Sequence, residues 1–181
     1  MIPLKSRITV EVLNYYFINS EARHYVNELA RILDLDPKNL YRKLKELEKE
    51  GILKSEFAGK QRYFSFNKNS KIAKIYKQLF LQTIGLEDQL RKAIGKIRGV
   101  EHAYIYGSYA KHSMSASSDI DLLVIGNHST LDLQKGLNLI QRRIGREINV
   151  TNISSRELSI KIKKKNPFIR HIFSDKRIKL L

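Results

Sequence analysis

The run from Gly107 to Val124 constrains this chain more than any other segment. It reads GSYAKHSMSASSDIDLLV, in which ten residues separate a Gly-Ser pair from two aspartates, Asp119 and Asp121. The apolar residues 122–125 indicate a buried strand, and alternate side chains of a strand point to one face. The two carboxylates therefore share a face and repel each other. Such a pair is suited to holding a divalent cation, because Mg²⁺ commonly bridges carboxylates to substrate phosphates.

The Gly-Ser pair itself follows an expected strand over residues 102–106 and is expected to open a helix. Backbone N–H groups at the start of a helix can bind phosphate. The alternative interpretation is an ordinary surface turn, with Asp119 and Asp121 as plain strand-end residues.

The pattern G-S-x10-D-x-D resembles the nucleotidyltransferases of the DNA polymerase beta superfamily, and most closely their minimal branch. The resemblance covers residues 100–181, and its sharp part is confined to 107–124. It implies transfer of a nucleoside monophosphate, with AMP from ATP as the expected group, to a hydroxyl acceptor. It also implies Mg²⁺ or Mn²⁺ as cofactor, with Asp119 and Asp121 as catalytic metal ligands. Gly107 and Ser108 would then bind the nucleoside triphosphate.

The same family usually has a third carboxylate on a later strand, here expected to begin at Arg146. Alternation along that strand places Glu147, Asn149 and Thr151 on one face, and Glu147 is the only acid among them. By resemblance, Glu147 is the third metal ligand and catalytic carboxylate, although the family more often has Asp there. The alternative is that Glu147 forms a surface ion pair with Arg146 or Arg143.

Composition sets wider limits. The 181 residues suit one or two small domains, and a hydrophobic content of 42% is enough for their cores. No run of 18 apolar residues and no secretory signal is apparent, so we expect no membrane partner and a cytoplasmic location. The absence of cysteine excludes disulfides and thiolate metal sites.

The chain is strongly basic, with a formal net charge of +16. Residues 1–99 hold 20 Lys and Arg against 11 Asp and Glu, and residues 100–181 hold 14 against 7. Such an excess favours phosphate-rich partners through release of counterions. The alternative is that the charge serves only solubility.

The first third of the chain shows helical periodicity. Residues 8–18 form a mostly apolar segment, and a second segment repeats apolar residues between Val26 and Leu33 at helical spacing. Asp36 and Pro37 then predict the start of a helix, and Gly51 predicts its end. Two helices joined by so short a turn are typical of a helix-turn-helix.

Basic and polar residues on that second helix, over residues 37–50, and on the hairpin that follows are candidates for contact with double-stranded DNA. The hairpin is expected over residues 52–66 around a glycine-containing turn. Side chains of these types contact phosphates and base edges in a major groove. The predicted DNA-binding residues are Lys38, Asn39, Arg42, Lys43, Lys60 and Arg62.

This region, roughly residues 7–67, resembles the winged-helix regulators of the ArsR and MarR type. The resemblance implies an N-terminal winged helix-turn-helix that binds DNA. A winged helix that makes protein contacts, with its basic residues merely solvated, is the alternative. Two further helices are expected over about 70–84 and 86–98, and their apolar stripe is buried either in a homodimer or within the chain.

The remaining periodicities predict a helix over 130–144, a helix capped by Ser155 that runs to about Lys165, and a last strand over 177–181. The predicted fold class is α+β: a winged helix-turn-helix over 1–69, a helical linker over 70–99, and an α/β nucleotidyltransferase domain with a mixed sheet over 100–181. Minimal nucleotidyltransferases often act as antitoxins, so the resemblance implies a regulator whose protein acceptor is a HEPN-type toxin. The rival hypothesis is a non-catalytic DNA-binding regulator that senses nucleotide or a protein partner.

Overall fold

The computed structural model describes residues 6–115 and 117–181, which divide into two compact units. The first unit runs to Glu87 and includes Arg142–Gly145, and the second comprises Asp88–Gln141 and Arg146–Leu181. None of the helices in the described part of the chain has the length and apolar character of a membrane span.

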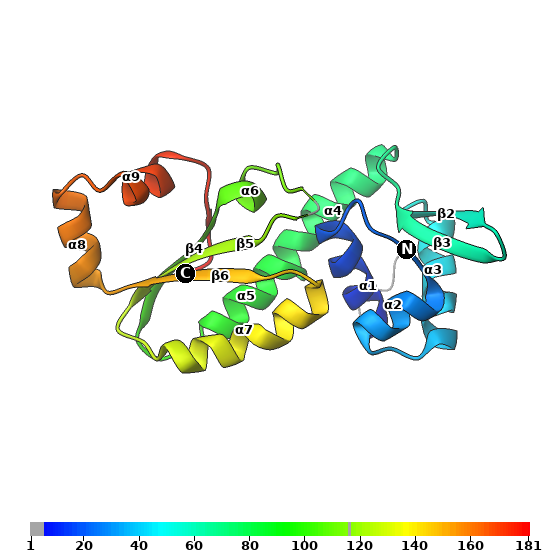
Figure 1. Ribbon diagram of the computed structural model, residues 1–181, viewed down its shortest axis with the longest axis horizontal. Coiled ribbons are helices and arrows are strands. Elements are labelled where there is room, and N and C mark those ends of the chain that lie inside the picture. The colour runs from blue at the N-terminus through cyan, green and yellow to red at the C-terminus, as the bar shows by residue number, and fades with distance from the viewer. Residues whose placement is uncertain (1–5, 116) are drawn as a thin grey trace. The chain divides into compact units, whose positions relative to one another are not determined.

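The first unit combines helices with a small antiparallel sheet of order β1-β3-β2. Figure 1 shows α1, α2 and α3 gathered beside the hairpin of β2 and β3. Its elements are, in chain order, α1 (Arg7–Ile18), β1 (Arg23–Tyr25), α2 (Val26–Leu33), α3 (Pro37–Lys49), β2 (Leu53–Ala58), β3 (Gln61–Phe66) and α4 (Lys71–Thr83). The expected helices and the hairpin are confirmed. Strand β1 is not predicted by any local pattern, and it forms because it pairs with the edge of β3 that β2 leaves open.

Helix α3 has the boundaries that its sequence predicts. The Asp36 side chain accepts a hydrogen bond of 2.9 Å from the Asn39 backbone N–H, and Pro37 occupies the first turn. Gly51 follows the helix with a φ of +73°, a conformation that favours glycine. Between these ends, one apolar face is buried, formed by Leu40, Leu44 and Leu47.

Helix α1 supplies the centre of the first unit's core. Tyr16 and Phe17 are fully buried, and the Tyr16 hydroxyl donates to the Phe64 carbonyl oxygen at 3.0 Å. Phe17 meets Phe66 and Phe80 edge-on, with ring centroids 5.5 and 5.4 Å apart. Full burial of such side chains stabilises a fold by about 1.5–3 kcal/mol each, so these contacts hold α1, β3 and α4 together.

The predicted apolar stripe of α4 is only partly buried. Ala73, Phe80 and Leu81 are buried, whereas Ile72 and Ile75 are 72% and 67% exposed. Leu79 is also exposed, one turn further along the helix. The helix therefore has a second apolar face directed to solvent.

The second unit is built on a mixed sheet, which confirms the predicted sheet type, and its strand order is β6-β5-β4-β7. Strand β5 pairs antiparallel with β4 and parallel with β6, and β4 pairs antiparallel with β7. The elements are α5 (Leu86–Ile94), β4 (Val100–Tyr106), α6 (Gly107–Ala110), β5 (Ile120–Gly126), α7 (Thr130–Ile144), β6 (Ile148–Ile153), α8 (Ser155–Lys163), α9 (Pro167–Ser174) and β7 (Ile178–Lys179). The cap of α8 is Ser154, whose hydroxyl accepts from the Glu157 N–H, so the predicted cap at Ser155 is wrong by one residue.

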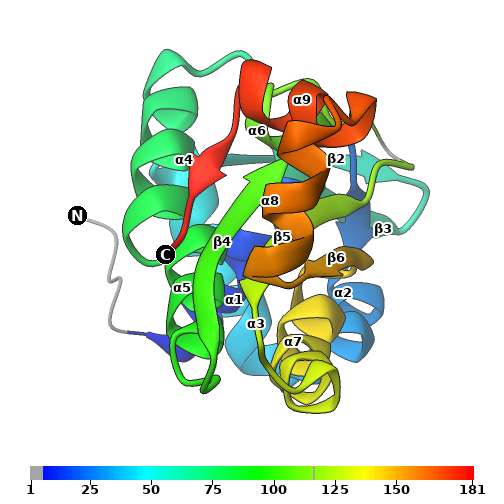
Figure 2. The ribbon, with the colours of Figure 1, turned by 90° about the vertical axis from the view of Figure 1, so that its left-hand side faces the viewer.

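The two faces of this sheet carry different helices. Figures 1 and 2 show α9 on one face of the sheet and α7 on the other. Leu123 and Ile125 of β5 form a buried cluster with Ile169 and Ile172 of α9. Because side chains alternate along a strand, Asp121 belongs to the same face as Leu123 and lies where the cover of apolar side chains ends.

Candidate active site

The two predicted metal-binding aspartates lie at the start of β5. Asp119 directly precedes the strand and Asp121 is its second residue, and both are half-buried. Asp121 is in register with Tyr106 of β4 on one side and with Asn149 of β6 on the other. Three neighbouring strands thus place three polar residues in one row.

Gly107 lies directly against Asp121. Its φ is +70°, and a Cβ built at this position would be only 2.2 Å from Asp121 Oδ2. A side chain here would meet both the backbone restriction and the carboxylate. The structure therefore brings these two predicted residues together. Glycine is needed at position 107 because a larger residue would clash with the Asp121 carboxylate.

Ser108 is the second residue of the single-turn helix α6. Its carbonyl oxygen accepts a hydrogen bond of 2.9 Å from the Ser113 N–H, and the Gly107 carbonyl accepts from the Lys111 N–H at 3.2 Å. Ser108 is half-buried. The predicted helical opening after β4 is confirmed, and it directs the chain past the Asp121 carboxylate.

Long-range contacts hold the described parts of the segment between α6 and β5. Lys111 forms an ion pair of 2.5 Å with Asp175, just after α9. At the other end, Arg146 Nη1 donates to the Ser118 carbonyl oxygen at 2.8 Å. This second contact fixes the backbone immediately before Asp119.

The electrostatics of the site favour a bound cation. Burial, and then the negative charge of Asp119, raise the pKa of Asp121 above its usual value. Each of these effects disfavours the ionised carboxylate, and a nearby cation would oppose both. Two carboxylates with oxygen ligands fit Mg²⁺ or Mn²⁺.

Glu147 lies just before β6 and is exposed. Its backbone carbonyl accepts a hydrogen bond of 2.9 Å from the Ile120 N–H, so its backbone is next to the aspartates. Across the described residues, however, no three His, Cys, Asp or Glu side chains cluster closely enough to hold a metal ion. The Glu147 backbone therefore lies beside the site, but among the described residues its carboxylate does not form a three-acid cluster with the two aspartates.

Asn149 of β6 contacts Asp119. Its Nδ2 donates to Asp119 Oδ2 at 3.1 Å. In the sequence, the signal for this contact is the strand alternation that groups the Asn149 amide with Glu147 on one face. Beyond Asn149 on the same face, the hydroxyls of Thr151 and Tyr106 lie 3.3 Å apart, and burial raises the pKa of Tyr106.

The predicted DNA-binding residues differ in their exposure and in their contacts within the first unit. Lys38, Asn39 and Arg42 are exposed on α3, and Lys60 is exposed in the Gly59–Lys60 turn of the hairpin. Lys43 forms an ion pair of 2.6 Å with Glu46, and only 16% of its side chain is exposed. These two groups therefore differ in their availability to an external phosphate.

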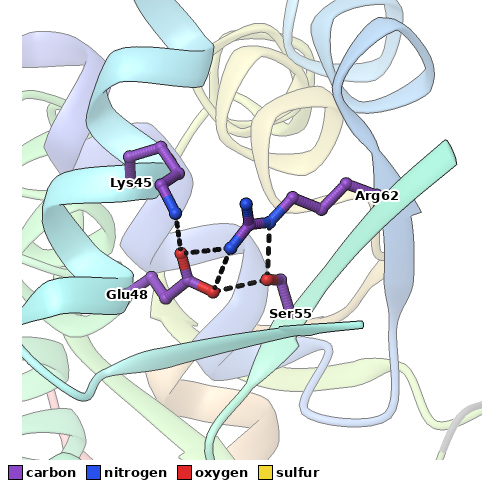
Figure 3. Close-up of polar contacts among 4 residues, drawn as sticks. All are labelled: Lys45, Glu48, Ser55 and Arg62. Carbon is purple, nitrogen blue, oxygen red and sulfur yellow. Dashed lines mark hydrogen bonds and ion pairs between the residues drawn. The ribbon is translucent and has the colours of Figure 1, made fainter. Parts of the chain in front are cut away.

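Arg62 belongs to a polar network inside the first unit. It donates to both carboxylate oxygens of Glu48 at 3.0 Å and to the Ser55 hydroxyl at 2.7 Å, while Lys45 also contacts Glu48 (Figure 3). Burial opposes ionisation of Glu48, but the hydrogen bonds from Lys45, Ser55 and Arg62 outweigh it and lower the pKa to about 2. Arg62 thus joins β3 to α3.

Comparison with known proteins gives one family. The model of the family described as "Polymerase beta, Nucleotidyltransferase" matches residues 88–178, which is half of the chain. A comparison with curated proteins gave no match.

Among solved structures, an adhesin competence repressor, AdcR, from Streptococcus pyogenes is 18% identical over 50% of this chain and 80% of its own, with a TM-score of 0.31. A putative nucleotidyltransferase from Sulfolobus solfataricus is 19% identical over 48% of this chain and 78% of its own, also with a TM-score of 0.31. Likenesses this distant do not bear on fold or function. The family match does, and it agrees with the paired aspartates beside Gly107: the chain belongs to the polymerase beta nucleotidyltransferase family.

Proposed function

We propose that the domain over residues 100–181 transfers a nucleoside monophosphate, AMP from ATP, to a hydroxyl acceptor. The observation that carries this proposal is the contact between Gly107 and Asp121, with Asp119 alongside, inside the domain that matches the family. A helical turn that begins at Gly107 and two carboxylates at the same end of the sheet are parts that could hold a triphosphate with its metal.

Asp119 and Asp121 would hold Mg²⁺ or Mn²⁺. The raised pKa of Asp121 supports this, since its ionised form gains most from a nearby cation. When bound, the metal would neutralise triphosphate charge and stabilise the charge that develops during transfer. Gly107 and Ser108 would orient the β- and γ-phosphates.

In the proposed reaction, the acceptor oxygen forms a bond to the α-phosphorus. The bond from that phosphorus to the bridging oxygen breaks, and pyrophosphate leaves with the electron pair. The proton of the acceptor hydroxyl passes to a base. We propose Glu147 for this role, because the family resemblance assigns it the third carboxylate position and its backbone carbonyl accepts from the Ile120 N–H beside the aspartates.

We further propose that the domain predicted over 1–69, of which the structure describes residues 6–69, is a winged helix-turn-helix that binds double-stranded DNA, followed by a helical linker over 70–99. Helix α3 would enter the major groove, and the β2–β3 hairpin would be the wing. Exposed Lys38, Asn39, Arg42 and Lys60 support this interpretation, whereas Lys43 and Arg62 are engaged within the unit. The net charge of +16 also favours a nucleic-acid partner.

A protein acceptor such as a HEPN-type toxin would make the chain an antitoxin and regulator. The exposed face of α4, with Ile72, Ile75 and Leu79, is compatible with a homodimer. These two partners follow from the family resemblance and from the apolar face, respectively.

A second candidate function is a non-catalytic, DNA-binding regulator that senses nucleotide or a protein partner. The contact of Asp119 with the amide of Asn149, in place of a further acid, favours this candidate. It shares the nucleotide site and the DNA surface with the first candidate but lacks turnover.

Turnover separates the two candidates. The pure protein would be incubated with α-³²P-labelled ATP, Mg²⁺ and candidate acceptors, among them proteins encoded by neighbouring genes. Transfer of label and release of pyrophosphate, both lost in Asp119→Asn with Asp121→Asn, would support transfer. Metal-dependent ATP binding without transfer would support a nucleotide sensor. The absence of such binding would contradict both transfer and nucleotide sensing, and would leave only a regulator that senses a protein partner.

A further inference from the structure

Asn149 is the third polar side chain of the aspartate site, and its position follows from the strand register. It is in register with Asp121 on the neighbouring parallel strand, and its amide reaches diagonally to Asp119. One residue of β6 is thus tied to both aspartates, to one through the backbone ladder and to the other through its side chain.

The chemistry of this contact requires an amide. Ionised Asp119 can only accept hydrogen bonds, so the group that meets its Oδ2 at 3.1 Å must donate. The Asn149 NH₂ group does so, while a carboxylate in its place would repel Asp119. The Asn149 Oδ1 remains available as a neutral oxygen ligand of a hard cation.

Charge then limits what the site can hold. The site has two negative charges, from Asp119 and Asp121, and among the described residues no third acid joins them. Without a nucleotide, one divalent cation balances these charges, whereas a second would leave an excess of positive charge. Ligand charge is a main determinant of affinity for such cations.

We propose that Asn149 is the positioning residue for Asp119 and that it makes the site a two-carboxylate site for one divalent cation. This inference rests on the proposed function, because the cation is the one that would accompany the triphosphate. It assigns the third position of the site to Asn149, with Glu147 outside the cation's ligand set.

The experiment titrates Mn²⁺ alone, without nucleotide, into the full chain, and free Mn²⁺ is measured by electron paramagnetic resonance. The variants are Asn149→Asp, Asn149→Ala, Glu147→Gln and Asp119→Asn with Asp121→Asn. Asn152→Asp is the matched control, because it is the same change on the same strand, at an exposed position in register with Val124 and therefore on the opposite face.

The parent should bind one Mn²⁺ per chain. The double variant Asp119→Asn with Asp121→Asn should not bind Mn²⁺. Asn149→Asp should tighten binding by about tenfold or more, since it adds a charged ligand. Asn149→Ala should weaken binding by about tenfold, because supporting hydrogen bonds to metal ligands commonly contribute 10–100-fold. Asn152→Asp and Glu147→Gln should match the parent in Mn²⁺ affinity.

Each outcome is decisive for the inference. Two Mn²⁺ ions in the parent, an Asn149→Asp affinity equal to that of Asn152→Asp, or a loss of Mn²⁺ binding in Glu147→Gln would overturn it. If the parent binds Mn²⁺ and only the Asn149 variants fail to show their expected changes in Mn²⁺ affinity, the inference fails but the proposed nucleotide site stands. If neither the parent nor Asn149→Asp binds Mn²⁺, the proposed site fails as well. Should Asn149→Asp not fold, as judged by circular dichroism, Asn149→Ala alone decides through its weakened binding.

Discussion

Arg62 on strand β3 forms an ion pair with Glu48 on helix α3 and donates hydrogen bonds to both carboxylate oxygens at 3.0 Å. The two side chains are 28% and 21% exposed, so the pair is largely shielded from water. Lys45 and Ser55 complete the network and join the hairpin to the helix. The proposed recognition helix and wing are therefore coupled by a contact between residues 14 positions apart in the chain.

Removing this arginine should destabilise the first unit. Arg62→Ala leaves the Glu48 carboxylate with fewer partners in a half-buried position, and we expect a loss of about 1–3 kcal/mol in the free energy of unfolding. Chemical denaturation would measure this loss. Lys60→Ala, at the exposed turn of the same hairpin, is the control and should change stability by less than about 0.5 kcal/mol. Equal stabilities for the two variants would show that the network does not support the hairpin.

The network should also respond to pH. The pKa of Glu48 is lowered from 4.5 to about 2 in the folded chain, so its ionised form stabilises the fold. That contribution is fully present above about pH 5 and is lost as the pH falls toward 2, because the unfolded chain then takes up the proton first. Denaturation of Glu48→Gln should show a shallower fall in stability over this range. Parallel curves for the variant and the parent would argue against a special role for Glu48.

Gly107→Ala should damage the aspartate site more than the fold. The substitution adds a Cβ that would be 2.2 Å from Asp121 Oδ2, at a φ of +70°. Gly59→Ala is a matched control, since Gly59 also has a positive φ of +60° but has no atom within 4 Å of an added Cβ. Both variants should lose about 1–2 kcal/mol of stability from the left-handed backbone. Only Gly107→Ala should lose Mn²⁺ binding, and retained binding would mean that Asp121 is not part of the metal site.

Glu147 can be tested as a base separately from metal binding. Glu147→Gln should leave Mn²⁺ and ATP affinity unchanged and lower transfer by about 100-fold or more, because a positioned base typically contributes that much. Rapid-quench measurement of labelled product would give the rate. Glu157→Gln, an exposed acid paired with Lys161 on α8, is the control. A normal rate in Glu147→Gln would leave Glu147 as a surface residue with no part in catalysis.

DNA binding should depend on the exposed cations of the first unit. Arg42→Ala with Lys60→Ala should weaken duplex binding, and each lost phosphate contact should reduce the log–log salt slope by about 0.9. Fluorescence anisotropy over a range of salt concentrations would measure both effects. Lys71→Ala with Lys74→Ala removes the same charge from exposed positions on α4 and should leave the slope unchanged. A parent-like slope in the first variant would indicate a protein-contact module or binding through another face.

Local patterns alone predicted most of the secondary structure. The Asp36-Pro37 start of α3, the buried Leu133, Leu137 and Ile140 of α7, and the apolar run of β5 all follow from periodicity and from capping chemistry. The turn at Gly107 and the start of the strand that holds Asp121 were likewise predicted, because a tight turn and a strand start have strong local preferences.

Tertiary structure alone decided which side chains meet at the aspartate site and at the hairpin. The register between β5 and β6 is set across the whole α7 crossover, and it brings the Asn149 amide, rather than a third acid, to Asp119. In the same way, the pairing of β3 with β2 and the packing of α3 turn Arg62 from a candidate phosphate ligand into the partner of Glu48. Sequence spacing determines which face of a strand a residue occupies, but the neighbour that it meets there depends on the packing of segments distant in the chain.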